Sequence, residues 1–267
     1  MFNLLCEALN QTTQSLKVIK DPSKHFSSAI KKQTSILPPH FQYCDFYLKQ
    51  QMKLLGSLLN DLYLILNYED SKESVLENSD NEALLISLFE VMLVSTSLSF
   101  NNIADPVISG AKLVMFAFID CCRDLQKIEL KQHLQKIFIQ TILNFLQIEL
   151  SKPNSPQRTV NLQIVLTVMY QFNYNCPITR KEDQIELAKL LKKTILEITA
   201  PSVIRLTARM CQSLWKTITP NHFKGEVIEE ILQTIGNYAK LHMEIAEEAP
   251  EKYTVQLHTS TCEEDLV

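Results

Sequence analysis

Glycine is scarce in this chain of 267 residues, which contains only Gly56, Gly110, Gly225 and Gly236. An average protein has roughly 7% glycine, several times more. Phosphate-binding loops, tight β-turns and nucleophile elbows need glycine because they require positive φ angles or a close approach of the backbone. The four glycines stand singly and cannot form such a loop. This scarcity argues against enzyme classes that depend on one.

The sequence also lacks the motifs of common catalytic and metal sites. It has no Walker-type phosphate loop, dinucleotide-binding fingerprint, serine-hydrolase elbow, HExxH pair or EF-hand loop. His242 and Glu244 match half of a zinc-deaminase motif, but the PCxxC half is absent. We therefore expect no catalytic residue, no metal site and no cofactor, and we interpret the chain as non-enzymatic.

Cysteine pairs with metal-binding or redox spacing are missing too. The seven cysteines are unevenly spaced and include no CxxC. Cys121 and Cys122 are neighbours in an apolar stretch, where consecutive side chains of a helix point about 100° apart. We expect them to pack in the core as small apolar residues, with a redox-sensitive site as the alternative. Reduced thiols predict a cytoplasmic or nuclear protein.

Neither an excess of positive charge nor a membrane-spanning run is present. The net charge is −4, which gives no overall reason to expect nucleic acid or an anionic membrane as a partner. The uncharged run 159–179 contains Asn161, Gln163 and Pro177, which are costly in hydrocarbon. The N-terminus has no basic region of the kind that begins a signal peptide. We expect no membrane association.

Helix-forming residues and helical periodicity dominate what is present. Apolar residues make up 46% of the chain and charged residues 21%, which is enough for a packed core. Apolar side chains from Tyr43 to Leu66, including Leu54, Tyr63 and Leu66, recur at steps of three and four residues and predict a long buried helix. Further helices are predicted at Asn81–Ser99, Pro106–Leu125, Glu129–Ser151, Gln157–Tyr174, Lys181–Thr199, Ser202–Thr219 and Gly225–Glu247, with one weak strand candidate at Tyr253–Leu257.

Polar segments divide these helices. The acidic stretch 70–81 and the turn-rich stretch 151–156 are predicted to be loops. We expect an N-terminal cap or mobile arm at 1–42, a helical domain at 43–250 and a C-terminal tail at 251–267. Whether the chain is complete or the end of a longer scaffold stays open, as does its oligomeric state.

Four prolines near predicted helix starts are nearly evenly spaced. Pro106, Pro156, Pro201 and Pro250 are separated by 50, 45 and 49 residues. Proline is tolerated in the first turn of a helix, where its missing N–H would have no partner. Two helical stretches lie between successive prolines, so the repeating unit would be a helix pair.

The stretch that begins at Pro201, with Val203, Arg205, Ala208 and Leu214, resembles the second helix of an armadillo or HEAT repeat. The resemblance covers about Ala104 to Pro250. It implies an all-α fold, an α-solenoid of stacked antiparallel helix pairs, although those repeats are somewhat shorter, at about 40–47 residues. The alternative is a non-repetitive helical domain.

One surface pattern marks a candidate binding site. Arg205, Arg209, Gln212 and Lys216 fall on one face of the predicted helix, and we call them the basic stripe. Much of the remaining circumference is apolar and carries Val203, Leu206, Met210, Leu214 and Trp215, and we expect Trp215 on this apolar side to be buried. The armadillo/HEAT resemblance implies that this helix lines a concave groove. A merely solvated face is the alternative.

These features predict a non-enzymatic scaffold or adaptor that binds a protein partner, with an acidic segment facing the basic stripe. The alternative is an accessory helical subunit of an enzyme or nucleic-acid complex that contacts nucleic acid through the same stripe. The identity of the partner cannot be read from the residues.

Overall fold

The computed structural model describes residues 2–20, 40–68, 72–96, 101–198 and 200–217, with short helical stretches at 232–234, 236–237 and 240. Of residues 18–20, 40–48, 72, 101–104 and 215–217 it describes only the backbone. The helix predicted at Gly225–Glu247 lies largely outside this part of the chain, and the strand candidate at Tyr253–Leu257 lies wholly outside it.

All regular structure in the described residues is helical, which confirms the predicted all-α class. No strand occurs among them. The helices are α1 (Phe2–Lys20), α4 (His40–Asn67), α5 (Lys72–Glu77), α6 (Asn81–Ser95), α7 (Asn101–Asp124), α8 (Ile128–Ser151), α9 (Pro156–Asn175), α10 (Lys181–Glu197) and α11 (Pro201–Thr217).

Several helix ends follow local signals in the sequence. Asp80 caps α6 by accepting a hydrogen bond from Ala83 N at 3.0 Å. Ser155 caps α9 by accepting one from Arg158 N at 3.1 Å, and Pro156 is the first residue of that helix. These side chains satisfy backbone N–H groups that have no partner within their own helix.

Two local predictions were wrong. α7 begins at Asn101, so Pro106 lies inside the helix and not at its start. The acidic stretch 70–81 contains the short helix α5. Glu73 Oε1 accepts a hydrogen bond from Gln126 N at 3.2 Å, and Lys127 Nζ lies 2.6 Å from Glu77 Oε1. The acidic side chains thus attach α5 to the turn between α7 and α8.

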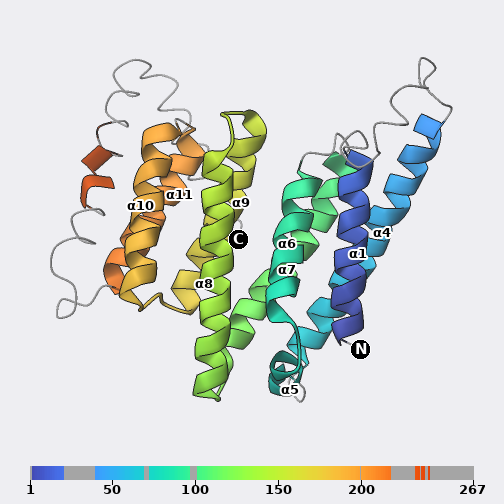
Figure 1. Ribbon diagram of the computed structural model, residues 1–267, viewed down its shortest axis with the longest axis horizontal. Coiled ribbons are helices and arrows are strands. Elements are labelled where there is room, and N and C mark those ends of the chain that lie inside the picture. The colour runs from blue at the N-terminus through green and yellow to red at the C-terminus, as the bar shows by residue number, and fades with distance from the viewer. Residues whose placement is uncertain are drawn as a thin grey trace, which may run out of the picture. The chain divides into compact units, whose positions relative to one another are not determined.

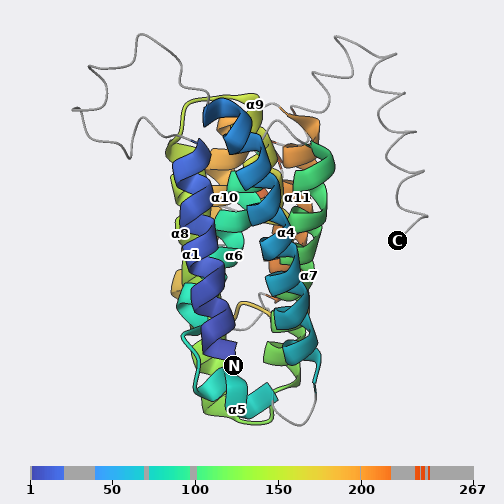
Figure 2. The same ribbon diagram turned by 90° about the vertical axis from the view of Figure 1, so that its right-hand side faces the viewer.

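The chain divides into two compact units, Met1–Ile178 and Thr179–Val267. In the first unit, α1 packs on α4, α6 on α7, and α8 on α9. These pairs are stacked: α1, α6 and α8 follow one another in one layer, while α4, α7 and α9 do so in a second layer (Figure 1). Figure 2 shows α1 and α8 on the left and α4 and α7 on the right. The core of this unit lies between the two layers.

Phenylalanine rings join the second and third helix pairs. Phe118 of α7, Phe138 of α8 and Phe172 of α9 are fully buried. The centroids of the Phe138 and Phe172 rings are 4.2 Å apart, and those of Phe118 and Phe138 are 6.0 Å apart. Stacked aromatic pairs of this kind stabilise a core beyond the area they bury.

Polar contacts connect neighbouring helix pairs of the first unit within each layer. Lys17 Nζ on α1 lies 2.5 Å from Glu90 Oε1 on α6. The Cys121 thiol of α7 donates to the Leu66 carbonyl of α4, with 3.1 Å between sulfur and oxygen. Such contacts specify which helix faces meet, while the buried apolar area supplies most of the stability.

The second unit contains α10 packed against α11. Leu187 and Leu191 of α10 and Met210 and Leu214 of α11 are buried. Both helices therefore follow the amphipathic pattern of their sequences.

Candidate functional site

The basic stripe predicted from the sequence lies on α11. Arg205 is half-buried, whereas Arg209 and Gln212 are exposed. The side chains of Lys216 and Trp215, the latter expected to be buried, lie outside the described part of the chain. Two guanidinium groups one turn apart offer bidentate hydrogen bonds to carboxylates or phosphates.

The buried side of α11 contrasts with the stripe. Val203 and Met210 are fully covered, and Cys211 is 1% exposed. Burial raises the pKa of the Cys211 thiol to about 12. This thiol is protonated at neutral pH and is a poor nucleophile, because thiolates and not thiols attack electrophiles.

The cysteines of the first unit behave in the same way. Cys121 and Cys122 are buried, as the sequence predicted, and both are free thiols. Burial raises the pKa of Cys122 well above its usual value and also raises that of Cys176. For Cys6, burial together with the nearby Asp80 carboxylate raises the pKa to about 12. We interpret these thiols as packing residues.

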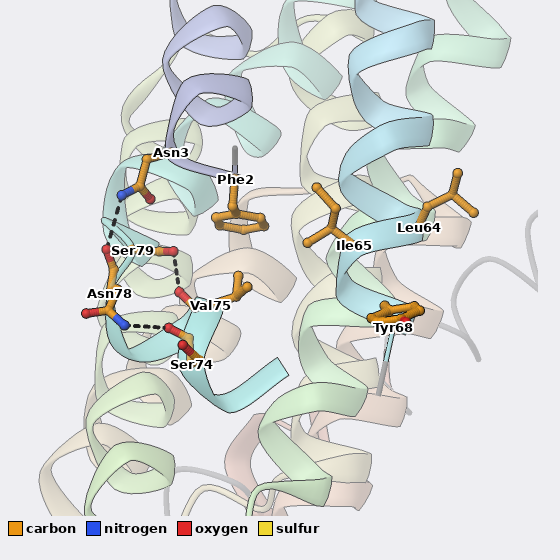
Figure 3. A pocket seen from close by; sticks show the side chains of 9 residues that line it. All are labelled: Phe2, Asn3, Leu64, Ile65, Tyr68, Ser74, Val75, Asn78 and Ser79. Carbon is orange, nitrogen blue, oxygen red and sulfur yellow. Dashed lines mark hydrogen bonds between the residues drawn. The ribbon is translucent and has the colours of Figure 1, made fainter. Parts of the chain in front are cut away.

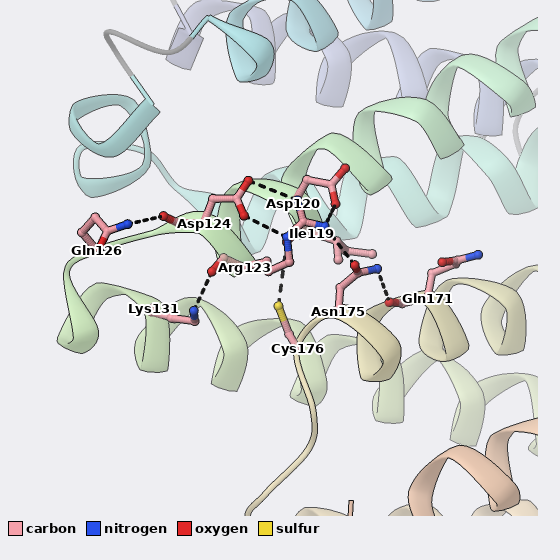
Figure 4. A network of polar contacts seen from close by, with 9 residues as sticks. All are labelled: Ile119, Asp120, Arg123, Asp124, Gln126, Lys131, Gln171, Asn175 and Cys176. Atoms are coloured by element: carbon pink, nitrogen blue, oxygen red, sulfur yellow. Dashed lines mark hydrogen bonds and ion pairs between the residues drawn. The ribbon is translucent and has the colours of Figure 1, made fainter. Parts of the chain in front are cut away.

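A polar network joins the ends of α7 and α9 to the start of α8 (Figure 4). Arg123 at the end of α7 binds Asp120 at 2.9 Å, Asp124 at 2.8 Å and the Asn175 side chain at 3.0 Å. Lys131 of α8 donates to the Arg123 carbonyl at 2.6 Å. The Arg123 guanidinium pairs with the carboxylates of both Asp120 and Asp124. The network therefore holds the ends of α7 and α9 and the start of α8 together.

Glu149 is the only fully buried carboxylate among the described residues, and it stands where α8 turns into α9. It pairs with Lys152 and accepts a hydrogen bond from Asn161 Nδ2 at 3.0 Å. Arg158 donates to the carbonyls of Glu149 at 3.0 Å and Leu150 at 2.7 Å, and these are end-of-helix groups that need a partner. The Glu149 carboxylate therefore belongs to a buried polar cluster that stabilises the turn between α8 and α9.

A pocket of about 560 Å³ opens in the first unit where the start of α1, the end of α4 and α5 meet. Its apolar walls are Phe2 from α1, Leu64 and Ile65 from the end of α4, Tyr68 directly after α4, and Val75 from α5. Figure 3 shows Ile65 of α4 pointing towards Phe2 and Val75 across the opening, whereas Leu64 points away from them. A volume of 300–1,000 Å³ is usual for pockets that hold ligands.

The opposite side of the pocket is polar but uncharged. It consists of Asn3, Ser74, Asn78 and Ser79. Asn3 Nδ2 donates to the Asn78 carbonyl at 3.1 Å, and Asn78 Nδ2 donates to the Ser74 carbonyl at 2.8 Å (Figure 3). These bonds hold the start of α1 against α5, so the polar wall is formed before any ligand enters.

Among the described charged side chains that neighbour the pocket residues along the chain, carboxylates predominate. We considered the described side chains that lie within four residues of a lining residue along the chain. All the charged ones are carboxylates: Glu7, Asp61, Glu73, Glu77, Asp80 and Glu82. Lys127 pairs with Glu77 and lies 3.9 Å from Glu73. The other four take part in no ion pair with a described residue. Among the described side chains, negative charge therefore predominates beside the lining residues.

The sequence reasoning missed this pocket. It predicted a long buried helix from Tyr43 to Leu66, yet Leu54 is 46% exposed and Tyr63 is 36% exposed. The sequence did contain a signal for the pocket, because this helix and the residue after it have more apolar side chains than one buried face accommodates. Leu64 and Tyr68 fall outside that face. The other walls come from segments that sequence alone did not place beside α4.

Within the described ranges, no three His, Cys, Asp or Glu side chains are grouped so that they could hold a metal ion. No described helix is long and apolar enough to cross a membrane. Comparison of the chain with protein families, curated proteins and solved structures finds no match in any of the three.

Proposed function

We propose that this chain is a non-enzymatic scaffold or adaptor that binds a protein partner through an extended helical surface. The observation that carries the proposal is the stacking of α1/α4, α6/α7 and α8/α9 in two layers. Stacked helix pairs of an α-solenoid bury a continuous core between the layers and leave long outer faces for binding. We propose that the first unit is such an array, of the armadillo/HEAT type, and that α10 and α11 form a helix pair of the same kind.

The positions of the prolines support this arrangement. Pro156 and Pro201 begin α9 and α11, while Pro106 lies inside α7. Each of these helices packs against the helix that precedes it. The proline spacing thus corresponds to the second helix of each pair.

The chemistry of the described side chains supports a binding role over an enzymatic one. The perturbed thiols have raised pKa values, which keeps them protonated. The most buried carboxylate, Glu149, is held by Lys152 and Asn161. Free thiols also support a location in a reducing compartment, the cytosol or the nucleus.

The basic stripe on α11 is the surface that we propose contacts the partner. The Arg209 side chain is exposed and that of Arg205 half-exposed, so an acidic segment can reach both. Changing both arginines to glutamate should abolish capture of the main partner from cell extract. Helicity and melting temperature should stay nearly constant, because exposed charges contribute little to stability.

Lys49 and Lys53 provide the matched control. They are exposed and have the same four-residue spacing on α4. Their double change to glutamate should leave capture intact, whereas a general effect of negative charge would reduce capture in both variants. Retention of the partner by the arginine variant would mean that the stripe is only solvated surface.

The two arginines are also the observation that favours the second candidate, an accessory subunit that contacts nucleic acid. Phosphate contacts release counterions, so such binding would weaken steeply as salt concentration rises. Titration of labelled single- and double-stranded oligonucleotides at several salt concentrations separates the two functions. Salt-dependent binding that is lost in the arginine variant would favour the nucleic-acid role.

A further inference from the structure

The pocket at the start of α1 has features of a recognition site that the basic stripe does not share. Its lining is apolar on one side and neutral on the other, and it lies in the first unit, whereas the stripe lies in the second. Phe2 is only 6% exposed and forms part of the interior wall. Leu64 and Tyr68 form a rim that is 57% and 63% exposed.

This exposed rim indicates the size of the occupant. A small molecule seated inside the pocket would leave much of the Leu64 and Tyr68 side chains in water. A protein segment could insert an apolar side chain and cover the rim with its neighbouring residues. Buried apolar or aromatic anchors of this kind carry most of the energy at protein interfaces.

The charges at the opening indicate the chemistry of that segment. Asp61 is exposed on α4 one turn before Leu64, and Glu7 is exposed on α1 one turn after Asn3. Asp80 follows the polar wall and lies close enough to α1 to raise the pKa of Cys6. Exposed carboxylates next to the lining residues, on α1, on α4 and directly after the polar wall, attract cations and repel acidic segments.

We propose that this pocket binds one or two large apolar side chains presented by a lysine- or arginine-rich segment of a protein partner. The inference rests on the proposed binding function and assigns it a second contact surface. The aromatic ring of Tyr68 at the rim can also hold a cation above its face. The Tyr68 and Ser74 hydroxyls have no hydrogen-bond partner among the described residues, so both can bond to the backbone of the inserted segment.

The test uses a displayed library of random 12-residue peptides selected on the full-length chain. We expect the selected peptides to combine a leucine, methionine or aromatic residue with flanking lysines or arginines. Labelled copies of these peptides are then titrated by fluorescence polarisation. Their affinity should fall when the salt concentration is raised, since the charges at the opening are exposed to solvent.

Three variants locate the binding. Ser74→Phe fills the pocket, Tyr68→Ala removes its rim and Asp61→Lys reverses one charge at the opening. Ser74→Phe should weaken peptide binding by at least about tenfold, as expected for a block at the centre of an interface, and the two rim variants should weaken it measurably but less. The matched controls Ser109→Phe on α7, Tyr174→Ala on α9 and Glu186→Lys on α10 change exposed residues of the same types and should keep full affinity. Circular dichroism confirms that each variant is folded.

Three results would overturn the inference: no peptide enriched above background, enrichment of acidic peptides, or basic peptides that bind all pocket variants unchanged. The Arg205→Glu/Arg209→Glu variant distinguishes this failure from that of the proposed function. If it loses the main partner while the pocket variants keep it, the scaffold function stands and the pocket has no part in it.

Discussion

Gly56 is the residue at which a single substitution should stabilise the protein most simply. It lies in the middle of α4, it is exposed, and a Cβ atom added there would meet nothing within 4 Å. Glycine in a helix costs about 0.5–1 kcal/mol relative to alanine, because the unfolded chain loses more freedom on folding. Gly56→Ala should therefore raise the free energy of unfolding by about that amount in urea titrations.

A substitution at Gly110 on α7 tests whether the gain in stability comes from the helix propensity of alanine. A Cβ atom there would lie 3.4 Å from Leu59 Cδ1 of α4, which is an ordinary van der Waals contact. Gly110→Ala should also stabilise the protein, by the same helix effect. If neither alanine variant is more stable than the parent, the helical assignment of these segments is wrong.

At the scale of helices, the third pair depends on the ring of Phe138. This side chain from α8 contacts Phe118 of α7 and Phe172 of α9 and is completely buried. Phe138→Ala should lower the free energy of unfolding by about 3–5 kcal/mol, through lost burial and the cavity that remains. Urea titration followed by circular dichroism measures the loss.

A second phenylalanine of α8 serves as the control for this prediction. Phe145 is half-buried and stacks on Phe89 at 4.9 Å. Phe145→Ala removes the same atoms from a less covered position and should cost less, since cavity energy grows with burial. Equal losses in the two variants would contradict the packing described for α7, α8 and α9.

For the whole molecule, the buried thiols predict a loss of stability in alkali. The pKa of Cys6 and of Cys211 is raised from 9.0 to about 12, chiefly by burial. Between pH 9 and pH 12 these two thiols lose their protons in the unfolded chain but keep them in the folded chain. The free energy of unfolding should thus be constant below about pH 8 and fall above pH 9, for Cys211 by up to about 1.4 kcal/mol per pH unit. Cys6 contributes less because it is only half-buried.

Urea midpoints at pH 8 and pH 10 measure this decrease. Lysine and tyrosine also titrate in alkali, so the comparison requires the Cys6→Ala/Cys211→Ala variant. Its midpoint should fall less between the two pH values than that of the parent. An identical fall in both proteins would show that the two thiols do not contribute.

What the sequence determined by itself is local. A 3.6-residue period, scarce glycine and capping residues decide within a few turns that a segment is helical, and Pro156 and Pro201 begin helices as predicted. The same period identified Val203, Met210 and Leu214 as the buried side of α11. These features depend only on residues within one or two helical turns along the chain, and their spacing is given directly by the sequence.

Only the tertiary structure decided which of several apolar faces is covered. Leu54, Tyr63 and Leu64 belong to the same periodic helix as Leu55 and Leu62, yet they face solvent because α1 and α7 cover the other sides of α4. The pocket joins Phe2, Leu64 and Val75, which are far apart in sequence. Burial and concavity arise from helices that pack against one another, and the period of a single helix carries no information about its partner.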